Sequence, residues 1–177
     1  QGDAQEYFVH LFEDLSKRTP IKYEVNPLNH LDLWGIPVLI LAGWGWSKRR
    51  VEVPGYFPTS PLAACFIPLS GVVANFALVG ILSTLYLMLP FSLLEVAIAI
   101  NIQIAFANLM IPIPPLALGR ALVCPFQLSL DQQFSVDFLG KLVILALVVA
   151  EYTMHWPLFR PLIMKPSSFV LEWVLRW

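Results

Sequence analysis

Three long stretches of the chain carry no charged side chain, and this spacing limits the fold more than any other feature of the sequence. No Asp, Glu, Lys or Arg occurs in residues 53–94, 96–119 or 142–150. A helix of about 20 apolar residues crosses the hydrocarbon core of a bilayer, where only helices and closed barrels satisfy the backbone polar groups. The sequence therefore predicts an all-α integral membrane protein, of a bacterial inner membrane or an organelle membrane.

The overall composition agrees with this location and excludes other classes. Of the 177 residues, 58% are apolar and 13% are charged, which lies outside the range of soluble domains and excludes intrinsic disorder. The formal net charge is -1, and no long cationic run could neutralise a phosphate backbone, so nucleic acid is not expected as a partner. Lipids and other membrane protein subunits are the expected partners.

About three transmembrane helices are expected in a membrane domain that covers residues 31–156. Each lies between turn-forming or charged residues, as spans of this length do. Proline ends the second helix, because it cannot continue the backbone hydrogen bonding, and aromatic residues lie at the end of the third, where an interfacial belt is usual. The expected helices are residues 61–89, 93–113 and 138–156.

Residues 31–46 are apolar but too short and too rich in glycine for a straight span. They contain Gly35, Pro37, Gly43 and Gly45. Broken backbone at membrane depth needs protein or water to satisfy its polar groups, so we expect a re-entrant segment that packs on the other helices. A short amphipathic surface loop is the alternative.

The two ends of the chain differ from the membrane domain. Residues 1–30 form a polar N-terminal region whose residue order is not that of a signal peptide. Most Lys and Arg residues lie on its side of the expected spans, which favours the cytoplasm, matrix or stroma for that side.

Residues 157–177 form an amphipathic tail in which Ser167 is an expected helix cap. The tail helix lies in the membrane interface or binds a partner, and the sequence leaves both open. Its apolar face comprises Phe169, Val170, Trp173, Val174 and Trp177.

Small and amide side chains in the first two expected helices are candidates for helix packing. Small residues at four-residue spacing let a neighbouring helix approach closely, and amides are costly in lipid unless they are paired across helices or lie in a cavity. Packing is favoured over a substrate site. The expected packing residues are Ser70, Gly71, Ala74, Asn75, Asn101 and Asn108.

The sequence offers little material for a metal site. Its three histidines and two cysteines are widely separated, and no two histidines flank a glutamate as in H-E-x-x-H, so neither a metal nor a cofactor is expected. Glu6 and His10 are spaced as i and i+4, which predicts a surface ion pair. Glu95 and Glu151 lie near expected helix ends, where interfacial placement is favoured over a proton relay.

Three segments of the chain carry short motifs. Residues 26–35 read N-P-L-N-H-L-D-L-W-G, residues 68–75 read P-L-S-G-V-V-A-N, and residues 108–120 read N-L-M-I-P-I-P-P-L-A-L-G-R. In order and spacing they resemble the site-2 protease family of intramembrane zinc metalloproteases, in which they read N-P-x-x-H-x-D-P-x-G, A-G-P-x-A-N and N-L-x-P-I-P-P-L-D-G-G-R. The resemblance covers residues 5–122.

The resemblance also implies which positions would bind zinc. Members of the family use the two His of an H-E-x-x-H motif and the Asp of L-D-G, and the motif Glu activates a metal-bound water. Here Gln5 and Val9 occupy the histidine positions, Glu6 keeps the glutamate position, and Ala117 stands in place of the aspartate. Without ligands no zinc is held, so the resemblance implies a catalytically inactive member.

Three functions compete at this point. The first is a non-catalytic membrane protein that serves as a structural or assembly subunit of a larger membrane complex, and its size and aromatic content suggest a bioenergetic one. The second is an active intramembrane zinc metalloprotease with atypical ligands such as Glu6, His10 and His30. The third is a pigment- or cofactor-binding helix bundle with His10, His30 or His155 as an axial ligand.

Overall fold

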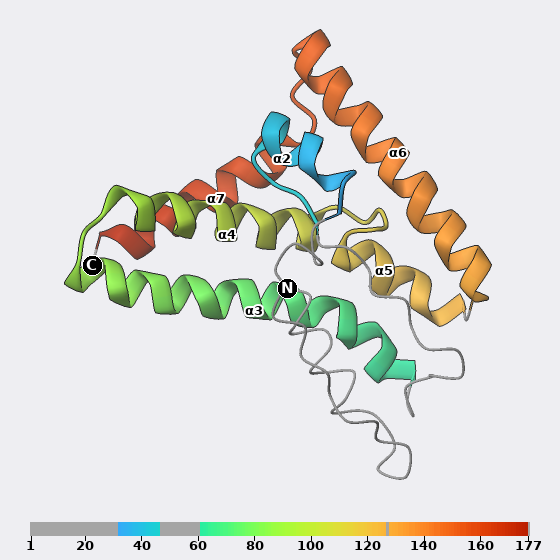
Figure 1. Ribbon diagram of the computed structural model, residues 1–177, viewed down its shortest axis with the longest axis horizontal. Helices are drawn as coiled ribbons and strands as arrows, with labels where there is room; N and C mark the ends of the chain where they lie inside the picture. The colour runs from blue at the N-terminus through green and yellow to red at the C-terminus, as the bar shows by residue number, and fades with distance from the viewer. Residues whose placement is uncertain (1–31, 47–60, 127, 177) are drawn as a thin grey trace.

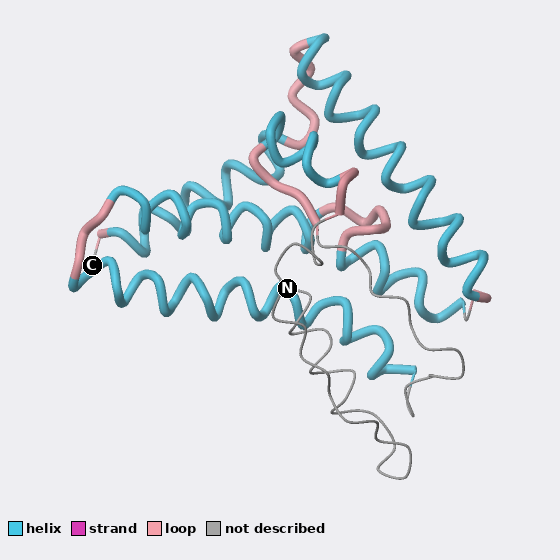
Figure 2. Tube along the Cα trace, in the orientation of Figure 1, coloured by secondary structure: helices cyan, strands magenta, loops and turns pink. Residues whose placement is uncertain are grey.

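The computed structural model describes residues 32–46, 61–126 and 128–176. All regular elements in these ranges are helices (Figures 1 and 2). Three of them, α3, α4 and α6, are long and apolar enough to cross a membrane, which confirms the expected all-α membrane fold. The polar region 1–30 lies outside the described residues. The helices are α2 (Gly35–Ala42), α3 (Pro61–Met88), α4 (Ser92–Met110), α5 (Ala117–Val123), the 3-10 helix η3 (Cys124–Phe126), α6 (Leu130–Met154) and α7 (Arg160–Leu175).

Helices α3 and α4 form an antiparallel hairpin joined by a tight turn at residues 89–91. Val79 packs against Ile98 and Ile102 in one buried cluster. The second helix ends at Met110, three residues before the end expected from the sequence. The reason is that the residue before Pro112 has extended backbone, as steric contact with a proline ring requires.

Helix α6 begins earlier than the sequence predicts. It starts at Leu130 rather than residue 138, because the Ser129 hydroxyl accepts a hydrogen bond from the backbone N–H of Gln132 and the Gln132 side chain accepts one from the backbone N–H of Ser129. This reciprocal capping box fixes a helix start. Lys141, the charged residue near the expected start of this span, lies inside the helix and pairs with Asp32, and Asp137 pairs with Arg120.

The turn between α6 and α7 is built on the side chain of Glu151. Its carboxylate accepts hydrogen bonds from the backbone N–H groups of Leu158, Phe159 and Arg160, with donor–acceptor distances of 3.1, 3.1 and 2.9 Å. The first N–H groups of a helix have no partner within the helix, so Glu151 caps α7 from the preceding helix.

The expected cap at Ser167 is wrong. Ser167 lies buried inside α7, and its hydroxyl donates to the carbonyl of Ile163 at 2.6 Å. Glu151 takes over the capping, which lets α7 begin at Arg160, eight residues before the start that a cap at Ser167 would give. The expected apolar face of the tail is also divided, because Val170 and Val174 pack inward.

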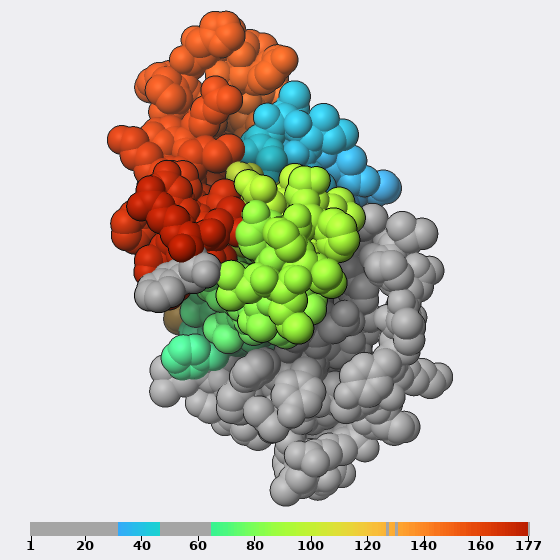
Figure 3. Space-filling view, turned by 90° about the vertical axis from the view of Figure 1, so that its left-hand side faces the viewer, coloured from blue at the N-terminus to red at the C-terminus, as the bar shows by residue number. Residues whose placement is uncertain are grey.

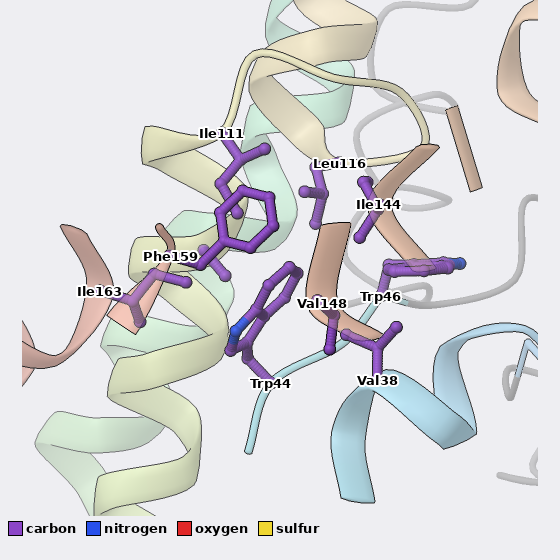
Figure 4. Close-up of a cluster of buried hydrophobic side chains, with 10 residues drawn as sticks. Val38, Trp44, Trp46, Ile111, Leu116, Ile144, Val148, Phe159 and Ile163 are labelled. Carbon is purple, nitrogen blue, oxygen red and sulfur yellow. The ribbon is translucent and has the colours of Figure 1, made fainter. Parts of the chain in front are cut away.

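The largest buried cluster joins the segment around α2 to the end of α4, the middle of α6 and the start of α7 (Figure 4). Trp44 and Phe159 meet edge to face in this cluster, with ring centroids 5.6 Å apart. Elements that are far apart in sequence are therefore held by one apolar core. Its labelled members are Val38, Trp44, Trp46, Ile111, Leu116, Ile144, Val148, Phe159 and Ile163.

Removal of the Glu151 carboxylate should loosen α7. Glu151→Ala removes the acceptor of three N–H groups at the start of α7, so the free energy of unfolding in detergent should fall by about 0.5–2 kcal/mol, as for the loss of a helix cap. Glu95→Ala is the matched control, because Glu95 is exposed and accepts no such set of bonds among the described residues. Equal loss of stability in the two variants would contradict the capping role.

Candidate functional site

Residues 32–46 fold back on themselves, and Asp32 closes the loop. Its carboxylate, only 5% exposed, accepts hydrogen bonds from the indole N–H of Trp46 and the backbone N–H of Trp34, both at 3.1 Å. Lys141 of α6 forms an ion pair with the same carboxylate at 2.6 Å. The two ends of the segment therefore lie side by side, as a re-entrant segment requires.

Glycine makes this reversal possible at two places. Gly43 ends α2 with a φ of +77°, a left-handed conformation that glycine adopts without steric cost. At Gly35, a Cβ atom would lie 3.1 Å from the carbonyl oxygen of Trp46, so the outgoing and returning backbones touch. The returning chain then places Trp44 in the main core, so this segment packs on the other helices.

The amide of Asn108 joins this segment to the hairpin and to α5. Its oxygen accepts a hydrogen bond from the backbone N–H of Ala117 at 3.1 Å. Its nitrogen donates to the carbonyls of Gly45 at 3.4 Å and Ile104 at 2.9 Å. Asn108 is 3% exposed, so both polar atoms of a buried amide are satisfied. The returning end of residues 32–46 and the third sequence motif meet at this side chain.

The loop of residues 111–116 is wedged between α5 and α6. A Cβ atom at Gly119 of α5 would overlap the backbone of Ile113 and Pro114, and one at Gly140 of α6 would overlap the carbonyl of Pro114. Gly140 lies between Asp137 and Lys141, whose ion pairs tie α6 to α5 and to the re-entrant segment. The third motif is thus fixed by close backbone contact on two sides.

Ala117 begins α5 in apolar surroundings. It is 2% exposed and shares a buried cluster with Val72 of α3 and Ala105 of α4. The second motif is therefore packed against the third. Among the described residues, no group of three or more His, Cys, Asp or Glu side chains lies close enough together to hold a metal ion. The site brings the second and third motif segments together around Ala117.

The expected packing residues of α3 and α4 differ in their surroundings. Ser70 is buried and its hydroxyl donates to the carbonyl of Ile67 at 2.6 Å. Asn101 donates to the carbonyl of Ala97 in its own helix at 2.8 Å. Among the described residues, the buried amide nitrogen of Asn75 has no hydrogen-bond partner. Gly71 is buried and Ala74 is partly buried on the same helix.

The positions that the resemblance assigns to the upstream metal motif lie outside the described residues. These are Gln5, Glu6 and Val9, together with His10 and His30. His155 is described, and it forms the exposed C-cap of α6 with a φ of 53°.

Sequence analysis missed the two ion pairs that hold α6. Both involve partners far apart in the chain, Asp32 with Lys141 and Arg120 with Asp137. The available signal was the occurrence of Asp137 and Lys141 one turn apart in an otherwise apolar helix, because charges at membrane depth are placed against one another.

Comparison with known proteins gives one distant relative. No model of a protein family matches the chain, and no solved structure matches it. The chain is similar to a protein of Bacillus subtilis (strain 168) that carries the name "Putative zinc metalloprotease YwhC", with 26% identity over 190 residues, covering 96% of this chain and 86% of the relative. This similarity supports a protease-like relationship over almost the whole chain.

Asn108→Ala should destabilise the protein far more than Asn101→Ala. The first change leaves the N–H of Ala117 and the carbonyl of Gly45 buried without a partner, at about 1–3 kcal/mol for each buried group. The second removes a bond within one helix turn and should cost less than about 1 kcal/mol. Unfolding of both variants in detergent micelles measures the difference. Similar losses would mean that Asn108 does not join the three segments.

Proposed function

We propose that this chain is a non-catalytic membrane protein that keeps the scaffold of the site-2 protease family and serves as a structural or assembly subunit of a larger membrane complex. The observation that carries the proposal is the environment of Ala117. This residue stands where the family motif has its aspartate, and it lies among apolar side chains with 2% exposure.

The chemistry of zinc explains why this position matters. A catalytic zinc site needs three protein ligands and an open position for water. The methyl group of Ala117 has no lone pair to donate to a metal, and its backbone N–H is engaged by Asn108. A carboxylate in the same place would lose its hydration without a compensating partner. The position favours packing over metal binding.

The remaining motif residues support a scaffold that holds together without metal. Asp32 closes the re-entrant segment, Asn108 binds the start of α5, and Gly119 admits the backbone of the preceding loop. Each of these contacts is made to other parts of the protein. A chain built in this way can keep its fold and present its surface to other subunits with no reaction at its centre.

An active intramembrane zinc metalloprotease is the second candidate, and the name of the Bacillus subtilis relative favours it. In that case the ligands would include Glu6, His10 and His30, and the metal would activate water for peptide hydrolysis. Metal content separates the two candidates.

Purified protein should contain no stoichiometric zinc, and Ala117→Asp should not gain any. Because the new carboxylate is buried among apolar side chains, Ala117→Asp should lower the free energy of unfolding by about 2–4 kcal/mol. Ala117→Asn is the control, since it has the same size without the charge. Elemental analysis of both variants and the parent gives the metal content. One zinc per chain in the parent protein would overturn the proposal and favour the protease.

The subunit role has its own test. After mild detergent extraction from its native membrane, the chain should migrate in native electrophoresis within an assembly far larger than its 19.9 kDa. Extraction in a harsher detergent should release it, which controls for micelle size. A stable single chain under mild conditions would rule out the subunit role, whatever its metal content.

A further inference from the structure

Helix α5 lies along the first half of α3 and runs in the opposite direction. Ala117, the first residue of α5, shares a buried cluster with Val72 of α3. From there α5 and η3 follow α3 back toward its beginning (Figures 1 and 2), and both stay in contact with it. Two segments that are far apart in the sequence are therefore packed side by side.

The two cysteines of the chain occupy matching positions on these segments. Cys65 lies seven residues before Val72, and Cys124 lies seven residues after Ala117. Seven residues are about two turns of an α-helix, so each step covers the same length and returns to nearly the same face. Cys124 keeps helical dihedral angles, with φ of -53° and ψ of -42°, and its N–H donates to the carbonyl of Arg120. Because the two helices are antiparallel, the equal steps bring Cys65 and Cys124 to the same level, facing each other between α3 and η3.

The cysteine pair lies at the end of α3 that is remote from the hairpin turn. The turn and the end of α7 face the viewer in Figure 3, at the other end of α3. The stretch of α3 that is apolar enough to cross a membrane begins at Cys65, and η3 is followed by the exposed residues Ser129 and Asp131. Both cysteine side chains are partly exposed. A reagent dissolved in water can therefore reach them at this end of the hairpin.

We propose that Cys65 and Cys124 are a modification site, in which a small water-soluble disulfide such as oxidised glutathione converts the two thiols reversibly into a disulfide between α3 and η3. The inference goes beyond the proposed function and does not depend on it. Both cysteines lie outside the three sequence motifs, about two helix turns from the cluster around Ala117.

The reaction is thiol–disulfide exchange. One cysteine loses its proton to water and its sulfur bonds to one sulfur of the reagent, whose other half leaves as a thiolate and takes up a proton. The second cysteine then loses its proton, and its sulfur attacks the cysteine sulfur of the mixed disulfide, so that the second half of the reagent leaves in the same way. The chain is oxidised and loses two hydrogen atoms, and the reagent is reduced to two thiols.

The disulfide would fix the end of α5 to the beginning of α3. It would close a loop that contains most of the α3–α4 hairpin, and a cross-link over a loop stabilises a fold by restricting the unfolded chain. The oxidised chain should therefore unfold in detergent at a higher temperature than the reduced chain.

Oxidation of the full-length chain in its membrane tests the cysteine pair. The membranes are treated with oxidised glutathione, the remaining thiols are blocked with a maleimide, and the intact mass of the chain is measured. The chain should be lighter by two hydrogen atoms and carry neither reagent, and reduction with dithiothreitol before blocking should give two maleimide adducts instead. Cys65→Ala and Cys124→Ala should each carry one glutathione or one maleimide, because neither can close the disulfide.

Phe66 provides the control for register. In the double variant Cys65→Ala/Phe66→Cys the thiol moves by about 100° around α3, to a position whose native side chain is 59% exposed. This variant should take up glutathione or maleimide and form no disulfide with Cys124, because Cβ atoms that point apart cannot be bridged. A disulfide formed to the same extent as in the parent chain would overturn the inference. So would a parent chain that carries a reagent on both cysteines after oxidation, a covalent dimer, or cysteines that react only after denaturation.

Discussion

The hydrogen bonds of the Asn108 amide are the contacts on which the rest of the structure depends. One side chain holds the last turn of α4, the first residue of α5 and the returning arm of the re-entrant segment. The contacts to Gly45 and Ala117 are buried, so each of these two backbone groups would be costly without a partner. No apolar side chain could replace this amide, because packing alone does not satisfy N–H and carbonyl groups.

The placement of α6 follows from that junction. Once the loop after α4 is fixed, its backbone can lie against Gly140, and the charges on either side of this glycine reach Asp32 and Arg120. Buried ion pairs add little net stability, because desolvation offsets their attraction, but they favour one register over others. An apolar helix alone could slide or rotate against its neighbours. The two ion pairs and the glycine contact leave α6 one position.

The sequence was sufficient for the α3–α4 hairpin, because it depends on local signals such as charge-free length and proline. It was insufficient where partners are distant. Lys141 alone indicates the boundary of a span, because its partner Asp32 lies far away in the chain. Ser167 alone indicates a helix cap, because the true acceptor, Glu151, belongs to the preceding helix. The apolar side chains of a helix also do not reveal whether they face lipid or pack on protein. The position of α7 could therefore not be predicted from the sequence.

The residues of the sequence motifs fall into two groups according to their contacts, and the difference is relevant to the proposed function. Asp32, Asn108 and Gly119 contact backbone groups or charged side chains of other segments. A substitution at any of them would therefore destabilise the fold. Ala117 touches apolar side chains and gives only its backbone N–H to the network. An alanine at that single position therefore leaves the scaffold intact. If the centre of the protein contributes packing alone, recognition of other subunits must lie at its surface.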